Sequence, residues 1–188
     1  MKTLILSLAL LAILIPVHGL PARCNLTVED ADGCAKKFMM IGNEEIRLPR
    51  SDDEVIHWCD TLYEGVQCLR RYARLCLDQF TRQILIMIAA DAKAQGDERC
   101  KTEDARKELL EHLSCFIPEE KMMPLHLCME KYVAQMEVMI ALDKKQRIPA
   151  ACCSFHMFAG CVKSKLLQIC DKPETLKYME EMTEKIVC

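Results

Sequence analysis

The sequence has few of the residues that interrupt helices and few of the signals that mark strands. Its 188 residues include 6 glycines, 7 prolines and a single tryptophan. Alternation of apolar and polar residues never extends beyond a few positions, and no Asn-Gly or Asp-Gly pair separates two β-branched runs, as a tight hairpin would require. These absences argue against a β-sheet protein and favour an all-α fold.

The chain also lacks a segment in which charge of one sign predominates. Its 25 basic and 28 acidic residues alternate throughout and give a formal net charge of -3 at pH 7. Nucleic acid, heparin and anionic membrane surfaces are usually bound by a stripe of basic residues. The sequence therefore argues against all three and predicts no nucleic-acid partner.

Only one apolar run is long, and it lies at the N-terminus. Leu4 to Val17 follows one positive charge, at Lys2, and ends in Val17-His18-Gly19. A charged region, a short apolar region and small residues in this order are typical of a secretion signal, and the run is shorter than the ~20 residues of a spanning helix. We predict a signal peptide over 1–19 and a single secreted domain over 20–188, without a membrane anchor.

Cysteine, in contrast, is abundant. In a chain exported to an oxidising compartment, so many thiols are expected to form disulfides, although the spacing does not reveal their pairing. The thirteen are Cys24, Cys34, Cys59, Cys68, Cys76, Cys100, Cys115, Cys128, Cys152, Cys153, Cys161, Cys170 and Cys188.

An odd number of cysteines leaves one without a partner. It is either free and buried, or bonded to a second subunit in a disulfide-linked dimer, or paired with a cysteine beyond Cys188, where the given sequence ends. Adjacent Cys152 and Cys153 are expected to bond to different partners, because a disulfide between neighbours is strained.

The spacing of apolar residues predicts the helices. Ser51 and Glu54 form a predicted capping box, after which apolar residues from Val55 to Cys76 recur three and four positions apart. The second helix is either separate from the first or continuous with it, and Gly96-Asp97 is expected to end it. Pro149 is expected to begin the fifth helix. We expect a disulfide-stapled all-α bundle of about five to seven helices. The later helices are predicted over 77–94, 102–115, 122–144, 149–170 and 173–186.

The cysteines of the first long helix predict how it is stapled. Cys68 and Cys76 are separated by roughly 80° around a helix, whereas Cys59 and Cys68 point to opposite sides. Cysteines eight residues apart lie ~12 Å apart along the axis, which is too far for a bond between them. Each bridge should therefore join two helices, and this helix can be stapled on two sides.

Equal cysteine intervals suggest an internal repeat. The interval from Cys34 to Cys59 equals that from Cys128 to Cys153, and a cysteine follows after a second shared interval in both series. Duplication and coincidence both remain open. A duplication predicts two related helical halves, 34–115 and 128–188, with equivalent disulfides.

One segment is similar to the Cys-Cys-x-x-His helix of secreted phospholipases A2, in which the histidine is a general base. Here the segment is Cys152-Cys153-Ser154-Phe155-His156, but Met157 stands where that family has a calcium-binding aspartate. The glycine-rich calcium loop of the family is also missing. We therefore interpret His156 as a packing residue and predict no catalytic residues and no enzyme activity.

The sequence also bears on metal sites and on catalytic nucleophiles. No Gly-x-Ser-x-Gly nucleophile elbow occurs. His57 with Cys59 and His126 with Cys128 come nearest to the spacing of metal ligands, but thiols of a secreted chain are more typical of disulfides. We predict no metal and no cofactor. A hydrolase that uses His156 with His57 or His126 stays as a remote alternative.

Two further features concern the mature surface and interior. Asn25-Leu26-Thr27 is an acceptor sequence for N-glycosylation, so Asn25 is predicted to carry a glycan. Of 12 methionines, all but Met1 follow the signal. Such flexible side chains either fill an irregular core, which we favour, or line an apolar pocket for a ligand.

The run Trp58-Cys59, Cys68-Leu69, Tyr72 and Cys76-Leu77, followed by Cys152-Cys153, Cys161 and Cys170, resembles a group of secreted, cysteine-rich, all-helical arthropod proteins. They are mostly uncharacterised. The resemblance implies a secreted helical domain and brings no catalytic residues with it. The Cys-x-x-x-Cys pair of insect odorant-binding proteins and the paired Cys-x-x-Cys of saposin-like domains are absent.

Together these features predict a secreted, extracellular, non-enzymatic binding protein whose partner is an unknown extracellular protein or an apolar small ligand. Two alternatives stay open. One is a structural or assembly component of a secretion such as venom, saliva, silk or haemolymph. The other is a dedicated carrier of an apolar small ligand.

Overall fold

The computed structural model describes residues 24–139 and 141–184, and throughout this part of the chain the regular structure is helical. The predicted signal peptide, 1–19, and Cys188 lie outside the described residues. The disulfide-stapled all-α class is confirmed. The α-helices of the described residues are α2 (Val28–Lys36), α3 (Asp52–Cys76), α4 (Gln79–Cys100), α5 (Glu103–Leu113), α6 (Met123–Met139), α7 (Lys144–Ile169) and α8 (Pro173–Glu184), with 3-10 turns η1 (Ser114–Phe116) and η2 (Glu119–Met122).

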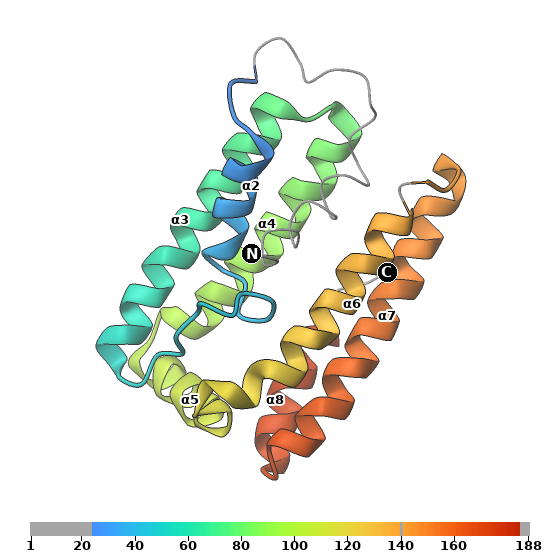
Figure 1. The fold of residues 1–188 in the computed structure, drawn as a ribbon. Helices are drawn as coiled ribbons and strands as arrows, with labels where there is room; N and C mark the ends of the chain where they lie inside the picture. The colour runs from blue at the N-terminus through green and yellow to red at the C-terminus, as the bar shows by residue number, and fades with distance from the viewer. Residues whose placement is uncertain (1–23, 140, 185–188) are drawn as a thin grey trace.

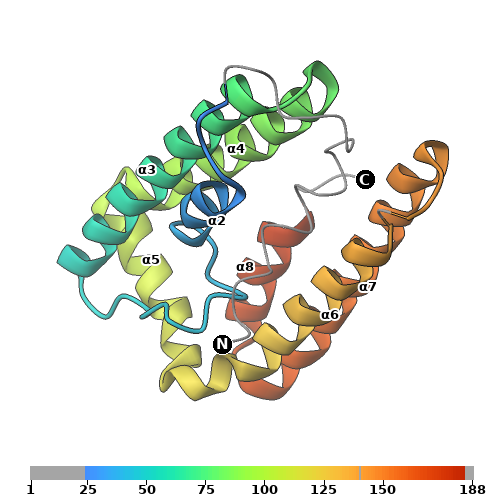
Figure 2. The same cartoon turned by 45° about the horizontal axis from the view of Figure 1, so that its top comes forward.

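The helices form two groups that diverge from one common end. In the first group α3 packs against α2 and α4, and in the second α6 packs along α7. Helices α5 and α8 lie at the end where the groups meet (Figures 1 and 2). The linker between α2 and α3, residues 37–51, runs from the first group past the start of α6 and back.

Three apolar clusters make up the core. One fills the common end around Phe116 and Leu125, one lies between α2, α3 and α4 around Tyr72, and the third lies between α6 and α7. Trp58 is partly buried and packs against both of the first two clusters. It therefore connects the first helical group to the common end.

The helix starts follow local capping chemistry, with one departure from the prediction. Ser51 accepts a hydrogen bond from the Glu54 N–H at 3.3 Å, as expected of an N-cap. The Glu54 carboxylate, however, accepts from the Arg50 N–H at 2.6 Å, so the predicted reciprocal bond to Ser51 is wrong. Helix α2 was not predicted at all, although Thr27 and Asp30 form a complete capping box at its start.

The predicted break at Gly96-Asp97 is also wrong, because α4 continues through it to Cys100. A Cβ on Gly96 would lie 2.8 Å from Leu62 Cδ2, so this glycine is needed for close packing of α4 on α3 rather than for a turn. Helix α4 thus ends later than predicted, and α5 begins at Glu103. Leu77-Asp78 lies between α3 and α4, which makes the first two predicted helices separate.

The ends of α6 and α7 differ from the prediction as well. Helix α6 ends at Met139 instead of near Lys144, and α7 begins at Lys144 with Asp143 at its N-cap. Pro149 therefore lies inside α7 rather than at its start. In the second turn it forfeits a single backbone hydrogen bond, and the packing of α7 against α6 holds the helix together.

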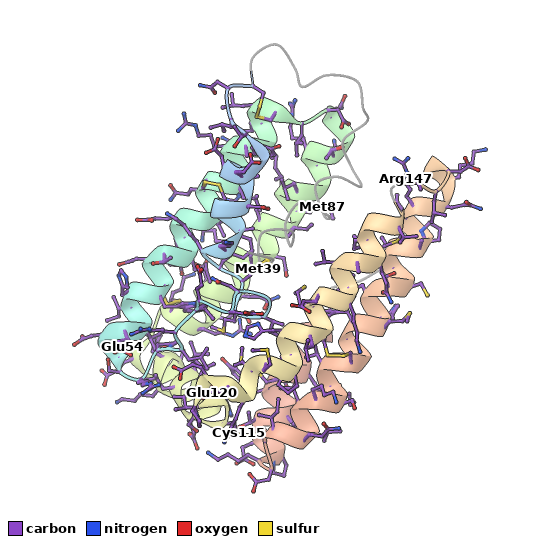
Figure 3. All side chains as sticks on the ribbon, in the orientation of Figure 1. Met39, Glu54, Met87, Cys115, Glu120 and Arg147 are labelled. Carbon is purple, nitrogen blue, oxygen red and sulfur yellow. A yellow bond between two sulfur atoms is a disulfide. The ribbon has the colours of Figure 1, made fainter. Side chains whose placement is uncertain are left out.

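The described bridges all join different segments, as predicted from helix geometry (Figure 3). Helix α3 is stapled on one side to α2 and the segment before it, and on the other side, through Cys59, to the end of α4. The bridges whose two partners are described are Cys24–Cys76, Cys34–Cys68, Cys59–Cys100, Cys115–Cys170 and Cys128–Cys161.

The adjacent cysteines of α7 differ in state. Cys152 is disulfide-bonded, whereas Cys153 is free and exposed. Cys153 therefore has no bridge within this chain, and the odd thiol is exposed rather than buried. Neighbours on a helix point about 100° apart, so the two sulfurs face different surroundings.

Two of the bridges occupy parallel places in the two helical groups. Cys34–Cys68 joins α2 to α3, and Cys128–Cys161 joins α6 to α7. Their sequence separations are 34 and 33. The internal duplication stays a prediction, because this pair of bridges corresponds but Cys59 is bridged whereas its counterpart Cys153 is free.

Candidate binding groove

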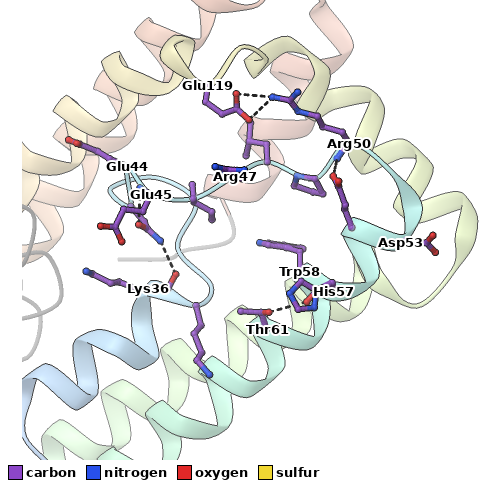
Figure 4. A pocket seen from close by; sticks show the side chains of 16 residues that line it. Lys36, Glu44, Glu45, Arg47, Arg50, Asp53, His57, Trp58, Thr61 and Glu119 are labelled. Carbon is purple, nitrogen blue, oxygen red and sulfur yellow. Dashed lines mark hydrogen bonds and ion pairs between the residues drawn. The ribbon is translucent and has the colours of Figure 1, made fainter.

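An open groove of about 1280 Å³ lies between the α2–α3 linker and the N-terminal half of α3 (Figure 4). Linker residues 43–50 form one wall, and α3 contributes the other through Asp53, His57 and Thr61. The C-terminal end of α2 and Glu119 of η2 complete the rim. The groove is thus built where the chain passes between the two helical groups.

Three attachments hold the linker over the groove. Its buried residues Leu48 and Pro49 anchor it on the core. The Arg50 guanidinium donates to both carboxylate oxygens of Glu119, at 2.8 and 3.0 Å. The backbone N–H of Gly42 donates to Nδ1 of His126 at 2.8 Å, across 84 positions of sequence. Each attachment fixes a different residue or pair of residues of the linker to another part of the molecule. The linker therefore holds a fixed position as the groove wall.

His126 is the interior end of the third attachment. It belongs to α6 and is only 5% exposed. The bond from Gly42 requires a neutral ring whose proton is on Nε2. Burial lowers the pKa of His126 below its ordinary value, while the nearby charges of Glu44 and Glu130 oppose that shift. The buried neutral ring and the Gly42 donor therefore support each other.

The groove presents charges of both signs. Arg50 and Glu119 are already paired, and this hydrogen bond lowers the pKa of the Glu119 carboxyl. Cationic Lys36 and Arg47 form no ion pair with any described side chain. Unpaired acids also line it: Glu44, Glu45 and Asp53. The groove thus offers uncommitted positive and negative groups to a ligand.

Trp58 gives the groove an aromatic surface. It lines the groove beside Ile46 of the linker and is the only tryptophan in the chain. Its indole Nε1 is buried and has no hydrogen-bond partner within the described residues. The side chain packs on the core and also faces the groove, so its fluorescence should report events there.

The predicted chemical residues lie apart from one another or are already engaged. Exposed His57 lines the groove, exposed His156 is on α7, and His126 holds the linker. Cys59 and Cys128 are in disulfides, which removes their thiolates from the two pairs with metal-like spacing. Within residues 24–139 and 141–184, no cluster of three His, Cys, Asp or Glu side chains could hold a metal ion.

Three methionines of the second helical group are buried, whereas Met123 and Met157 of the same group are exposed. Met129, Met136 and Met139 are buried with Val133 between α6 and α7, and Met39 of the linker packs against them. This arrangement supports the core interpretation over a methionine-lined pocket. Asn25, the predicted glycosylation site, is exposed just before α2, and its modification stays a prediction.

Sequence analysis did not identify the groove. Its acids, Glu44 and Glu45, look like ordinary surface charge, and His57 fits the sequence patterns only as a metal ligand or as part of a hydrolase site. The available signal was the segment between two helices that carries Gly42 together with buried Leu48 and Pro49. Gly42 adopts a φ of 95°, which other residues rarely take.

The fold and groove define a disulfide-stapled, all-α protein with a polar surface groove. A comparison with family models, curated proteins and solved structures found no match for this chain. In the part of the chain that the structure describes, no helix has both the length and the apolar character needed to cross a membrane.

Proposed function

We propose that this is a secreted, non-enzymatic binding protein that holds a peptide segment of an extracellular partner in the groove beside Trp58. The groove itself is the observation that carries the proposal. Its volume of about 1280 Å³ exceeds the ~300–1,000 Å³ typical of small-molecule sites. Its lining is also more charged than the mainly apolar lining of such sites.

The charges indicate which peptides would bind. Arg47 and Lys36 favour acidic side chains, and Glu44, Glu45 and Asp53 favour basic ones. A segment that carries both signs can satisfy both sets, whereas a uniformly charged segment meets repulsion from one of them. The bridges described above support an oxidising, extracellular setting.

The test combines peptide selection with tryptophan fluorescence. A random-sequence peptide library is selected against the purified protein, and enriched peptides are titrated while the emission of Trp58 is recorded. We expect saturable emission changes from peptides that contain both acidic and basic residues. Arg47→Glu should weaken binding of these peptides by about tenfold or more, because one favourable contact becomes repulsive.

Lys145→Glu provides the matched control. Lys145 is an exposed cation on α7, away from the groove, and its reversal changes the net charge equally. It should leave the affinity within twofold of the wild type. Equal losses in the two variants, or a library with no peptide that perturbs Trp58, would contradict the proposal. Saturable binding of oleate that displaces the peptides would instead favour an apolar carrier.

One observation favours a second candidate, covalent assembly. Cys153 is a free thiol on the surface of α7 and can bond to a second chain. The wild-type protein would then migrate at twice its mass on a non-reducing gel, and both reduction and Cys153→Ser would restore the monomer. A wild-type monomer under oxidising conditions would exclude this candidate.

A further inference from the structure

A second hollow, of about 610 Å³, lies on α3 and is lined mainly by arginine. Its walls are formed by Arg70, Arg71 and Arg74, together with Gln67 and Leu75. Residues three and four positions apart are neighbours on a helix surface, so Arg74 lies beside both of the other arginines. The sequence shows only the Arg70-Arg71 pair, and the helix adds the third cation.

These arginines are not committed to acidic partners. None of the ion pairs between described side chains includes Arg70, Arg71 or Arg74. The buried Nε–H of Arg70 also has no acceptor among the described residues. Glu64, one helical turn before Gln67, is engaged by Lys37 at 2.9 Å. The positive charge of the hollow is therefore available to a ligand.

The arrangement is not explained by helix stability alone. Like charges three and four residues apart repel one another, which disfavours the helix. The helix dipole favours cations near the C-terminal end, but this effect is confined to the last turn, and only Arg74 lies there. Arg70 and Arg71 gain little from the dipole and still repel Arg74. An anion in the hollow would relieve this repulsion.

We propose that this hollow is a binding site for the sulfate groups of a sulfated glycan chain. Guanidinium groups present planar pairs of N–H donors that match the oxygens of an oxyanion, and three of them can engage neighbouring sulfates. The chain is net negative, so any binding to a polyanion must come from a local site. The disulfides are typical of compartments in which such glycans occur. The sequence contains no run of basic residues that would predict heparin binding, and it is the helix that brings Arg74 beside Arg70 and Arg71.

The experiment is retention on immobilised heparin in a salt gradient. Wild-type protein is compared with the Arg70→Gln/Arg71→Gln/Arg74→Gln variant and with the control Lys131→Gln/Lys145→Gln/Lys177→Gln. Both variants lose the same charge, and the control lysines are exposed and distant from the hollow. We expect the Arg→Gln triple variant to elute without retention and the Lys→Gln control to elute close to the wild type.

A charge-preserving variant tests whether misfolding, rather than loss of the guanidinium groups, causes a loss of retention. Arg70→Lys/Arg71→Lys/Arg74→Lys keeps the charge but loses the paired donors, so it should elute between the wild type and the glutamine variant. Equal elution of the Arg→Gln triple variant and the Lys→Gln control would overturn the proposal. No retention of the wild type would also overturn it. Retention on desulfated heparin equal to that on heparin would also overturn it.

Two further experiments distinguish a sulfated glycan from a single sulfate ion and from a lipid surface. Free sulfate at a concentration that matches the bound sulfate groups should not release the protein, because the chain presents several groups at once. Release at that concentration would show a site for single ions and would contradict a glycan ligand. Sedimentation with phosphatidylserine vesicles without retention on heparin would assign the site to a lipid surface and would equally contradict it.

Discussion

Replacing Cys115 and Cys170 together with alanine should lower the free energy of unfolding by about 4 kcal/mol. This bridge closes a loop with a sequence separation of 55, which is the widest of the described bridges. A cross-link stabilises a protein mainly by reducing the conformational entropy of the unfolded chain, and the effect increases with loop length. The two half-cystines are 8% and 2% exposed, so their loss also weakens core packing.

The measurement is urea unfolding of the oxidised proteins, followed by circular dichroism. The double variant should unfold at a clearly lower midpoint, because about 4 kcal/mol is a large fraction of the ~5–15 kcal/mol that stabilises an ordinary domain. Cys153→Ser is the control, because that cysteine is free and exposed, and it should change stability by less than about 0.5 kcal/mol. Identical midpoints for the two variants would show that the bridge does not limit the unfolded chain.

The bridge also matters for the groove. Cys115 lies in η1, close in sequence to Glu119, which holds Arg50 of the linker. Loss of the bridge should therefore increase the solvent exposure of Trp58 before global unfolding. A red shift of its emission at low urea, absent from Cys153→Ser, would demonstrate this coupling.

Helical periodicity predicted most of the fold because it depends on residues close together in sequence. Residues 55–76 show this best, since their apolar spacing gave the buried face of α3 and the directions of its cysteines. The break predicted at Gly96 is wrong because the surroundings of this glycine are set by Leu62 on another helix, and a local sequence rule does not include that contact. Likewise, the N-terminal capping box at Thr27 was present in the sequence but precedes a helix too short to show clear periodicity.

The binding features depended on contacts that no local pattern contains. The groove exists because Arg50 meets Glu119 and Gly42 meets His126, over separations of 69 and 84 residues. The arginine hollow is intermediate, since helical geometry predicts that Arg70 and Arg74 are neighbours once α3 is known. Sequence alone could not show that no described acidic side chain of another element pairs with these arginines.

Acidification should loosen the linker through His126, and His126→Asn should remove this response. Burial lowers the pKa of His126 in the folded protein below its ordinary value of 6.5, so the unfolded chain takes up the proton first as the pH falls. The stability contributed by the neutral ring is therefore complete above about pH 6.5 and is lost as the pH decreases towards the folded-state pKa. The protonated ring can no longer accept the Gly42 hydrogen bond.

The variants separate titration from hydrogen bonding. His126→Leu leaves the Gly42 N–H without its acceptor and should cost about 1–3 kcal/mol at neutral pH. His126→Asn supplies an amide oxygen that can accept the same bond but does not titrate, so it should retain more stability than His126→Leu and show no loss through this window. The difference in unfolding free energy between wild type and His126→Asn, measured on both sides of pH 6.5, isolates the histidine from carboxylates shared by both proteins.

The same titration tests whether the linker controls the groove. If the Gly42–His126 bond holds the groove wall, the emission of Trp58 and the affinity for selected peptides should change with pH in the wild type and stay constant in His126→Asn. A parallel pH response in the two proteins would assign the effect to groups other than His126. A response confined to the wild type would make His126 the residue through which pH regulates binding, because it lies outside the groove lining and contacts the groove wall through its bond to Gly42.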